Sequence, residues 1–544
     1  MNLRKRLTVV CAAAALVLGA VAVVAGGCGG QEGSTFTPTQ PDSSLAASGT
    51  SNGSGGSGSA DGGSSSGGFG TLLGGDGGGG PPACALGDGG LASCVNLNCP
   101  ANSMTTLSGK VYDPAGSNPL YNVVVYVPRD PHGQLTPITL GTHSCNTCDV
   151  TIGDYVAAGV TDESGSFRIG PVPTGQNIPL VFQIGKWRRE IAVTTKDCSD
   201  TVVPAGQARL PRNQSEGDIP QMAILYGGCD QLPCFMRNMG LDAKEFTGPN
   251  AGGRLHVYQG DSTNGGSTPG PNLGGGGGGT AGNCTSNNAG NCPLWSQKSQ
   301  LERYDMVLLS CECDTHDDTK PNKQPLHDWL DEGGKVFATH YHYTWFENGP
   351  ADFQKVANWS DAGLTLNVPG PFQVDQSFPK GQAFYKWLGN VGALNANGTI
   401  NLTPSDVRTS VATVNPPTLR WIYDTTNENV KYLSFGTPIG GIDAGAGGAG
   451  GTGSGDAAAT EAGSSEAGSN EAGAGSSAGD AGEQTAPVYC GKAVLTDLHA
   501  GGGSNVAGSS APLPSSCKVG AMTPQEKALE FLFFDLSACV SNDN

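Results

Sequence analysis

Short alternating and apolar segments predict a strand-rich region between residues 84 and 212. The segments of strand length are 105–113, 121–127, 155–161, 166–170, 178–185 and 188–194. Turn-forming residues separate them, as in the Asp-Pro-Ala-Gly run at 113–116, and such spacing is typical of all-β domains. The pattern therefore predicts an N-terminal β-sandwich of immunoglobulin type.

From residue 213 onward, buried apolar strands alternate with helical patterns. The expected strands are 219–226, 304–310, 335–339 and 492–498, with a hairpin formed by 420–423 and 430–435. The expected helices are 230–239, 324–331 and 524–538. This alternation predicts a three-layer α/β domain over 213–544, with a mostly parallel sheet between helices. Thr523 and Pro524 are suited to begin the last helix, as its cap and first residue. The chain is thus expected to be a multidomain protein with both α and β structure.

The remaining segments lack such patterns. Residues 1–27 combine a basic start with the apolar run 7–25, which is the pattern of a secretory signal. Residues 28–83 are mostly Gly, Ser, Asp and Thr, too poor in apolar side chains to fold, and are expected to form a disordered tether with a span of roughly 40 Å. Two similar stretches, 260–290 and 440–486, are expected to be disordered inserts in the α/β domain.

The end of the signal, Ala-Gly-Gly-Cys at 25–28, resembles the lipobox of bacterial lipoproteins, although Ala25 stands where that family prefers Leu. The resemblance implies cleavage before Cys28 and a lipid anchor on that cysteine. Gly29 is not the Asp that retains Gram-negative lipoproteins at the inner membrane. We therefore expect export to the outer membrane or cell surface of a Gram-negative bacterium. An uncleaved membrane helix is the alternative, because 19 apolar residues are long enough to span a bilayer;.

The segments 107–113, Leu-Ser-Gly-Lys-Val-Tyr-Asp, and 161–167, Thr-Asp-Glu-Ser-Gly-Ser-Phe, resemble the carboxypeptidase regulatory-like domain. The resemblance implies a non-catalytic sandwich related to transthyretin and starch-binding domains, which in some relatives binds carbohydrate or other proteins. Trp187 precedes two arginines on a predicted strand and is a candidate for stacking on a sugar ring;. The alternative is an ordinary outward-facing strand residue.

The strand 305–309 and the segment 326–337 resemble the amidotransferase-like, flavodoxin-type fold. An amidotransferase of that family would need a cysteine nucleophile on the turn after the strand 335–339, where this chain has His340;. The resemblance therefore implies the fold without the activity. In its domain order the chain is similar to uncharacterised bacterial lipoproteins that carry a regulatory-like domain.

The large number of cysteines is typical of an exported protein. Of 17 cysteines, Cys11 and Cys28 lie in or directly after the apolar run, which leaves 15. An odd number cannot all pair within the chain, so at least one is free, intermolecular or bound to something else. Candidates for disulfides are Cys145, Cys148, Cys229, Cys234, Cys284 and Cys292. For Cys229, the partners Cys234, Cys311 and Cys313 all remain open.

Polar side chains follow the predicted parallel strands, at the sheet edge where ligands bind in such folds. Cys229, Asp230 and Cys234 follow the first of these strands. The candidate ligands after the other strands are Cys311, Cys313, His316, His340, His342, Glu347 and His499. If 311–313 and 340–342 stay extended, two thiolates and two imidazoles form a zinc-compatible set. The alternative is that the cysteines form structural disulfides and the histidines only pack the loops.

The net charge and the absence of hydrolytic sequence motifs limit the classes of function that the sequence supports. The net charge is −19, from 29 basic and 48 acidic residues, which disfavours binding to nucleic acid. No His-Glu-x-x-His or His-x-x-Glu motif occurs, and no complete catalytic set is recognisable. We therefore expect a non-enzymatic lipoprotein without a cofactor that binds carbohydrate or an envelope protein. The alternative is a metal-dependent or hydrolytic enzyme that uses the Cys/His cluster, with zinc as the metal.

Overall fold

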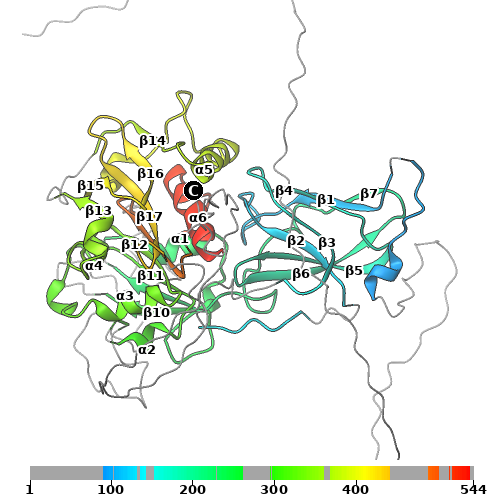
Figure 1. The fold of residues 1–544 in the computed structure, drawn as a ribbon, viewed down its shortest axis with the longest axis horizontal. Helices are drawn as coiled ribbons and strands as arrows, with labels where there is room; N and C mark the ends of the chain where they lie inside the picture. The colour runs from blue at the N-terminus through cyan, green and yellow to red at the C-terminus, as the bar shows by residue number, and fades with distance from the viewer. Residues whose placement is uncertain are drawn as a thin grey trace, which may run out of the picture. The chain divides into compact units, whose positions relative to one another are not determined.

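The computed structural model describes residues 90–101, 103–130, 135–141, 152–227, 229–260, 294–295, 297–360, 368–441, 488–500, 514 and 517–538. All of them belong to one compact unit that spans residues 70–544. Within these ranges the fold is mixed, and strands predominate over six α-helices (Figure 1). The predicted signal, the tether with Cys28 and nearly all of both predicted inserts lie outside the described residues.

The first region forms two small sheets. One has the strand order β4-β1-β7 and the other β3-β2-β5-β6. The strands are β1 (Thr106–Lys110), β2 (Val124–Pro128), β3 (Tyr155–Val160), β4 (Ser166–Ile169), β5 (Gly175–Ile184), β6 (Trp187–Thr195) and β7 (Asp200–Val202). The six strands predicted from the pattern of apolar residues are confirmed, and β7 is an addition that pairs in parallel with β1.

The second region is built on one sheet, with eleven strands in the described residues. These are β8 (Met222–Tyr226), β9 (Phe246–Thr247), β10 (Leu255–Gln259), β11 (Met306–Leu309), β12 (Lys335–Thr339), β13 (Ala357–Trp359), β14 (Phe372–Val374), β15 (Val411–Val414), β16 (Leu419–Asp424), β17 (Val430–Thr437) and β18 (Gly491–Thr496). The run β9-β10-β8-β11-β12-β18 is parallel throughout. Beyond β18 the pairing is antiparallel and includes the predicted hairpin β16–β17.

Helices accompany this sheet. They are α1 (Leu232–Asn238), α2 (Lys298–Leu301), α3 (Gln324–Asp331), α4 (Thr344–Glu347), α5 (Pro379–Asn390) and α6 (Pro524–Ser537). The predicted α1, α3 and α6 are confirmed. Helix α6 begins as expected with Thr523 as its cap, because the Thr523 hydroxyl accepts a hydrogen bond from the backbone N–H of Glu526 and the Glu526 carboxylate accepts one from Thr523;.

The strand order fixes where a site can form. Within the sheet, the chain first adds β9 and β10 to one side of β8. It then adds β11, β12 and β18 to the other side of β8. The order of the parallel strands therefore reverses between β8 and β11. In open sheets of this kind, ligands bind outside the carboxyl ends of the strands at such a reversal.

Helix α6 joins the two regions, since it packs on β12 and β18 of the large sheet and its aromatic side chains also contact the first region. The indole of Trp187, at the start of β6, lies edge-on to the rings of Phe533 and Phe534, with centroid distances of 6.3 Å and 5.8 Å. Tyr121 stacks on Phe531 at 5.8 Å. One continuous hydrophobic core therefore includes both regions.

The turn between β5 and β6 lies directly against the end of α6. Gly185 in this turn has a φ of +53°, and a Cβ atom there would lie 1.8 Å from the carbonyl oxygen of Ser537, so only glycine fits;. The next residue, Lys186, forms a buried ion pair with Asp305, 2.6 Å away, just before β11. The prediction that Trp187 is available for sugar stacking is wrong, because its packing against α6 leaves it 0% exposed.

A pair of buried carboxyl groups also spans this interface. Asp113 belongs to the first region and Glu530 to α6, and the Asn118 amide donates to Glu530 Oε2 at 2.6 Å. The other Glu530 oxygen, Oε1, and Asp113 Oδ2 are buried and have no hydrogen-bond donor among the described residues, so a proton between the two groups satisfies both. Burial raises the pKa of Asp113 to about 6. Burial, followed by the charge of Asp113, raises the pKa of Glu530 well above its usual value.

This pair predicts a pH-dependent stability. Both pKa values are higher in the folded chain, so the folded chain holds protons that the unfolded chain has released. The free energy of unfolding should therefore fall by on the order of 2 kcal/mol as the pH rises from about 4 through 6. It should continue to fall above pH 6, because Glu530 also stays protonated above its usual range in the folded chain;. Glu530→Gln should flatten this decline, as measured by denaturant titration at several pH values. Glu163→Gln, which removes a partly buried interface carboxylate paired with Lys386, is the control and should leave the decline unchanged. Equal slopes for all three proteins would contradict the assignment.

Candidate metal centre

Four neighbouring strands end at the sheet edge where the order reverses. In the order β18-β12-β11-β8 they are parallel, so their carboxyl ends lie along one edge. Cys311 follows β11, His340 follows β12 and His499 follows β18. Asp230 follows β8. These residues therefore lie along the edge of the sheet that was predicted from the strand order.

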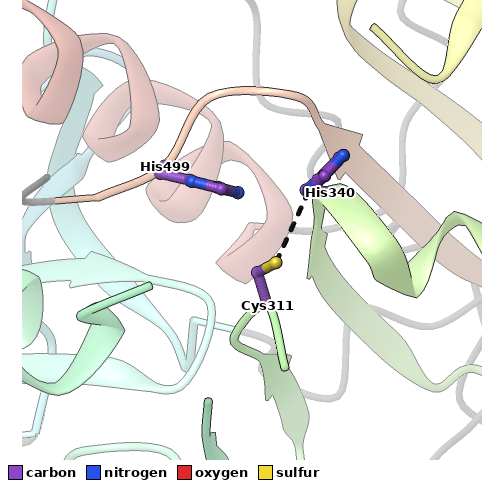
Figure 2. Close-up of side chains that lie close together, drawn as sticks. All are labelled: Cys311, His340 and His499. Atoms are coloured by element: carbon purple, nitrogen blue, oxygen red, sulfur yellow. Dashed lines mark hydrogen bonds between the residues drawn. The ribbon is translucent and has the colours of Figure 1, made fainter. Parts of the chain in front are cut away.

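The side chains of Cys311, His340 and His499 converge at this edge (Figure 2). One ligand atom from each lies within 4.8 Å of the other two. Cys311 Sγ is 3.5 Å from His340 Nδ1, and the two imidazole rings have a centroid distance of 5.2 Å. The residues are 0%, 1% and 4% exposed. We refer to these three residues as the Cys–His₂ cluster.

Backbone hydrogen bonds and backbone conformation hold these three residues in place. The backbone N–H of Cys311 donates to the Thr339 hydroxyl at 2.9 Å, which ties the end of β11 to the end of β12. His340 has a φ of +36°, a left-handed conformation that is costly for a residue with a Cβ atom and is concentrated at functional sites;. The His499 N–H donates to the carbonyl of Asp406 at 2.9 Å. Each member is therefore fixed by a strand end rather than by a loose loop.

Burial governs the electrostatics of the cluster. It raises the pKa of the Cys311 thiol to about 12. It also lowers the pKa of His499 well below its usual value, with smaller contributions from His340 and Arg408. The Cys–His₂ cluster therefore holds a neutral thiol and a neutral imidazole at pH 7. His499 Nε2 is buried and has no hydrogen-bond partner in the described part of the chain, so its lone pair or proton is unsatisfied.

Asp230 lies next to this cluster. Its Oδ1 accepts a hydrogen bond from the backbone N–H of Ala500, the residue after His499, at 2.7 Å. Burial raises the pKa of Asp230 to about 7, and the Thr339 hydroxyl opposes this shift. The other oxygen, Oδ2, is buried without a hydrogen-bond partner among the described residues.

The other predicted ligands do not join the cluster. Cys313 is bonded to Cys229 in a disulfide. His342 uses both ring nitrogens, since Nε2 is 2.9 Å from the Ser310 carbonyl and the Trp345 indole donates to Nδ1 at 3.2 Å. His316 Nε2 lies 3.2 Å from the Glu312 carbonyl. Glu347 is the last residue of α4 and is not part of the group.

The predicted set of two thiolates and two imidazoles is wrong because the chain does not stay extended beyond the strands. A 3₁₀ helix, His340–Tyr343, begins at the end of β12, so His340 and His342 point to different sides. Cys313 has a φ of +74°, which turns it away from Cys311 and toward Cys229. Nothing in the local sequence signals either turn.

Three disulfides lie within the described residues, and they show how some of the candidate cysteines pair. Cys229 pairs with Cys313, one of the three partners left open, and Cys234 pairs with Cys517 rather than with Cys229. A third bond joins Cys99 to Cys198. Within the described ranges, Cys311 is the one free thiol. The candidates Cys145, Cys148, Cys284 and Cys292 lie outside the described residues.

No family model, curated protein or solved structure matches this chain. Among the described residues, no helix is both long enough and apolar enough to cross a bilayer.

Proposed function

We propose that this chain is an exported, lipid-anchored binding protein whose α/β domain holds a zinc-type metal ion on Cys311, His340 and His499. The observation that carries the proposal is the Cys–His₂ cluster, a thiol and two imidazoles that are buried together at three adjacent strand ends. Thiolate sulfur and imidazole nitrogen are the ligands that zinc takes most often in proteins.

The setting of this metal site is the one expected from the sequence. An immunoglobulin- or transthyretin-like sandwich and a three-layer α/β domain are tethered through Cys28 to the outer membrane of a Gram-negative cell. The fused hydrophobic core of the two regions supports a role as one rigid binding unit. Carbohydrate or an envelope protein remains the proposed external partner, without Trp187 as a contact.

Metal binding fits the cluster better than nucleophilic catalysis does. Cys311 and His340 resemble a cysteine nucleophile and its base in their separation of 3.5 Å;. A carbonyl substrate, however, would have to reach a residue that is 0% exposed. A metal ion needs only the lone pairs of the three side chains, and its charge favours loss of the thiol proton.

The test is metal loading of the purified full chain. After treatment with a chelator, incubation with Zn²⁺ and dialysis, elemental analysis should find about one zinc per chain. Cys311→Ser and His340→Asn should each lower the zinc affinity by more than about 100-fold, because each removes a direct ligand. Asn is the suitable replacement for His340 because it tolerates the left-handed backbone.

The matched control is His316→Asn. His316 lies on the same sheet edge, also has a positive φ of 46°, and is outside the Cys–His₂ cluster. This variant should bind zinc as tightly as the unaltered chain. Retention of less than about 0.1 zinc per unaltered chain would refute the proposed function, since buried protein sites of this type hold zinc through dialysis.

A further inference from the structure

We infer that Asp230 supplies a fourth ligand to this metal ion, which closes a tetrahedral site of one thiolate, two imidazoles and one carboxylate. The inference rests on the metal-binding function proposed above. The four neighbouring parallel strands β8, β11, β12 and β18 would then each deliver one ligand from the segment that follows the strand.

Asp230 is held between two ligand segments. Its Oδ1 accepts a hydrogen bond from the backbone N–H of Ala500, one residue after His499. The preceding residue, Cys229, donates its backbone N–H to the Cys311 carbonyl at 3.1 Å, and its side chain is bonded to Cys313. The carboxyl group of Asp230 and the backbone before it are thus tied to the segments that carry His499 and Cys311.

Two buried polar atoms at this edge have no hydrogen-bond partner in the described chain. They are Asp230 Oδ2 and His499 Nε2. Each such atom costs free energy when it is removed from water without compensation. A single cation bound to both atoms would satisfy both at once.

The charges also balance. A divalent ion with one thiolate and one carboxylate gives a neutral centre, which removes the penalty for burying Asp230 in its charged form. The guanidinium of Arg408, which influences Cys311, instead donates to the carbonyls of Ser405 and Val407 at 2.6 Å and 3.1 Å. A bound cation therefore accounts for the carboxylate better than this neighbouring side chain does.

The fourth ligand decides the class of metal. Zinc accepts sulfur, nitrogen and carboxylate oxygen together, whereas copper(I) favours soft sulfur ligands and has little preference for a carboxylate. Four protein ligands leave no open position, which is typical of sites that stabilise a fold rather than of catalytic ones. Asp230 is outside the group of atoms that lie within 4.8 Å of one another, so binding must draw its carboxylate toward the ion.

The experiment uses Co²⁺ as a spectroscopic probe of the full chain. Thiolate-to-cobalt charge transfer reports Cys311, and the intensity of the visible bands reports tetrahedral coordination. Asp230→Asn should keep the charge-transfer band but weaken Co²⁺ and Zn²⁺ binding by about tenfold or more and alter the visible bands. The Asn side chain still accepts the Ala500 hydrogen bond, so thermal unfolding of the metal-free variant should show a folded protein.

Glu163→Gln is the control, because it makes the same carboxylate-to-amide change in the turn between β3 and β4, away from the sheet edge that carries the cluster. It should bind both metals like the unaltered chain. Equal affinity and spectra for Asp230→Asn and the unaltered chain would overturn the fourth ligand and leave the Cys–His₂ proposal intact. Absence of a charge-transfer band in the unaltered chain would refute both.

A second measurement does not depend on any variant. Added azide should leave the spectrum of the Co²⁺-loaded, unaltered chain unchanged, because a closed site has no position for it. A spectral change on addition of azide would show an open position and overturn the inference.

Discussion

Replacing Trp187 with alanine should lower the free energy of unfolding of the full chain by about 3–5 kcal/mol, the usual cost of truncating a buried aromatic side chain. The residue is 0% exposed and contacts Phe533 and Phe534 of α6. Its removal would open a cavity between β6 and α6, where the two regions share one core. Denaturant titration followed by circular dichroism measures the loss.

Two variants make this prediction specific. Trp187→Phe should cost less than about 1.5 kcal/mol, because it keeps an aromatic ring and removes an indole N–H that has no hydrogen-bond partner in the described chain;. Trp359→Ala should also cost less than Trp187→Ala, because Trp359 is only partly buried. A sugar-stacking Trp187 would give the opposite result, namely loss of glycan binding with stability unchanged within about 0.5 kcal/mol.

Trp187 shows what an alternating pattern cannot tell. The pattern predicted strand β6 correctly, because period-two alternation is a local property of the sequence. Which element covers each face of the strand depends on residues far along the chain, here Phe533 and Phe534. Trp187 was therefore expected at the surface, although α6 covers its indole.

In the α/β region, the elements with strong local signals were predicted best. Strand β12 and helix α3 have the predicted bounds, and α6 begins at Pro524 as expected. Helix α5 was not predicted, since Gly381 and Gly389 weaken its helical pattern even though Pro379 is at its first position;. Strands β9 and β13 have two and three residues, too few to show a period.

The site was predictable only as far as topology reaches. The rule that ligands gather at the carboxyl ends of parallel strands placed Asp230, Cys311, His340 and His499 along one edge. Which of the candidates meet depends on backbone turns at Cys313 and His340, and on which cysteines oxidise. These are tertiary outcomes, so His342 and Cys313 could not be separated from the ligands in advance.

Lys320→Met is expected to destabilise the full chain by about 3–5 kcal/mol, the cost of leaving a buried charge without its partner. The Lys320 ammonium lies 2.7 Å from Glu312 Oε2, and the two side chains are 0% and 1% exposed. It also donates to the Thr315 carbonyl at 2.9 Å and lies 5.1 Å from the centre of the Trp295 ring. Chemical denaturation of the variant and of the unaltered chain measures the difference.

A double variant separates the cost of the unpaired carboxylate from the cost of lost packing. Lys320→Met with Glu312→Gln should recover a substantial part of the loss, because no unpaired charge is then left inside. Lys298→Met is the control, since its partners Glu302 and Glu332 are exposed, and it should cost no more than about 1 kcal/mol. If the double variant were as unstable as Lys320→Met alone, packing of the lysine stem would explain the effect. If Lys320→Met cost no more than the control, the pair would contribute nothing to the rigid segment after Cys311.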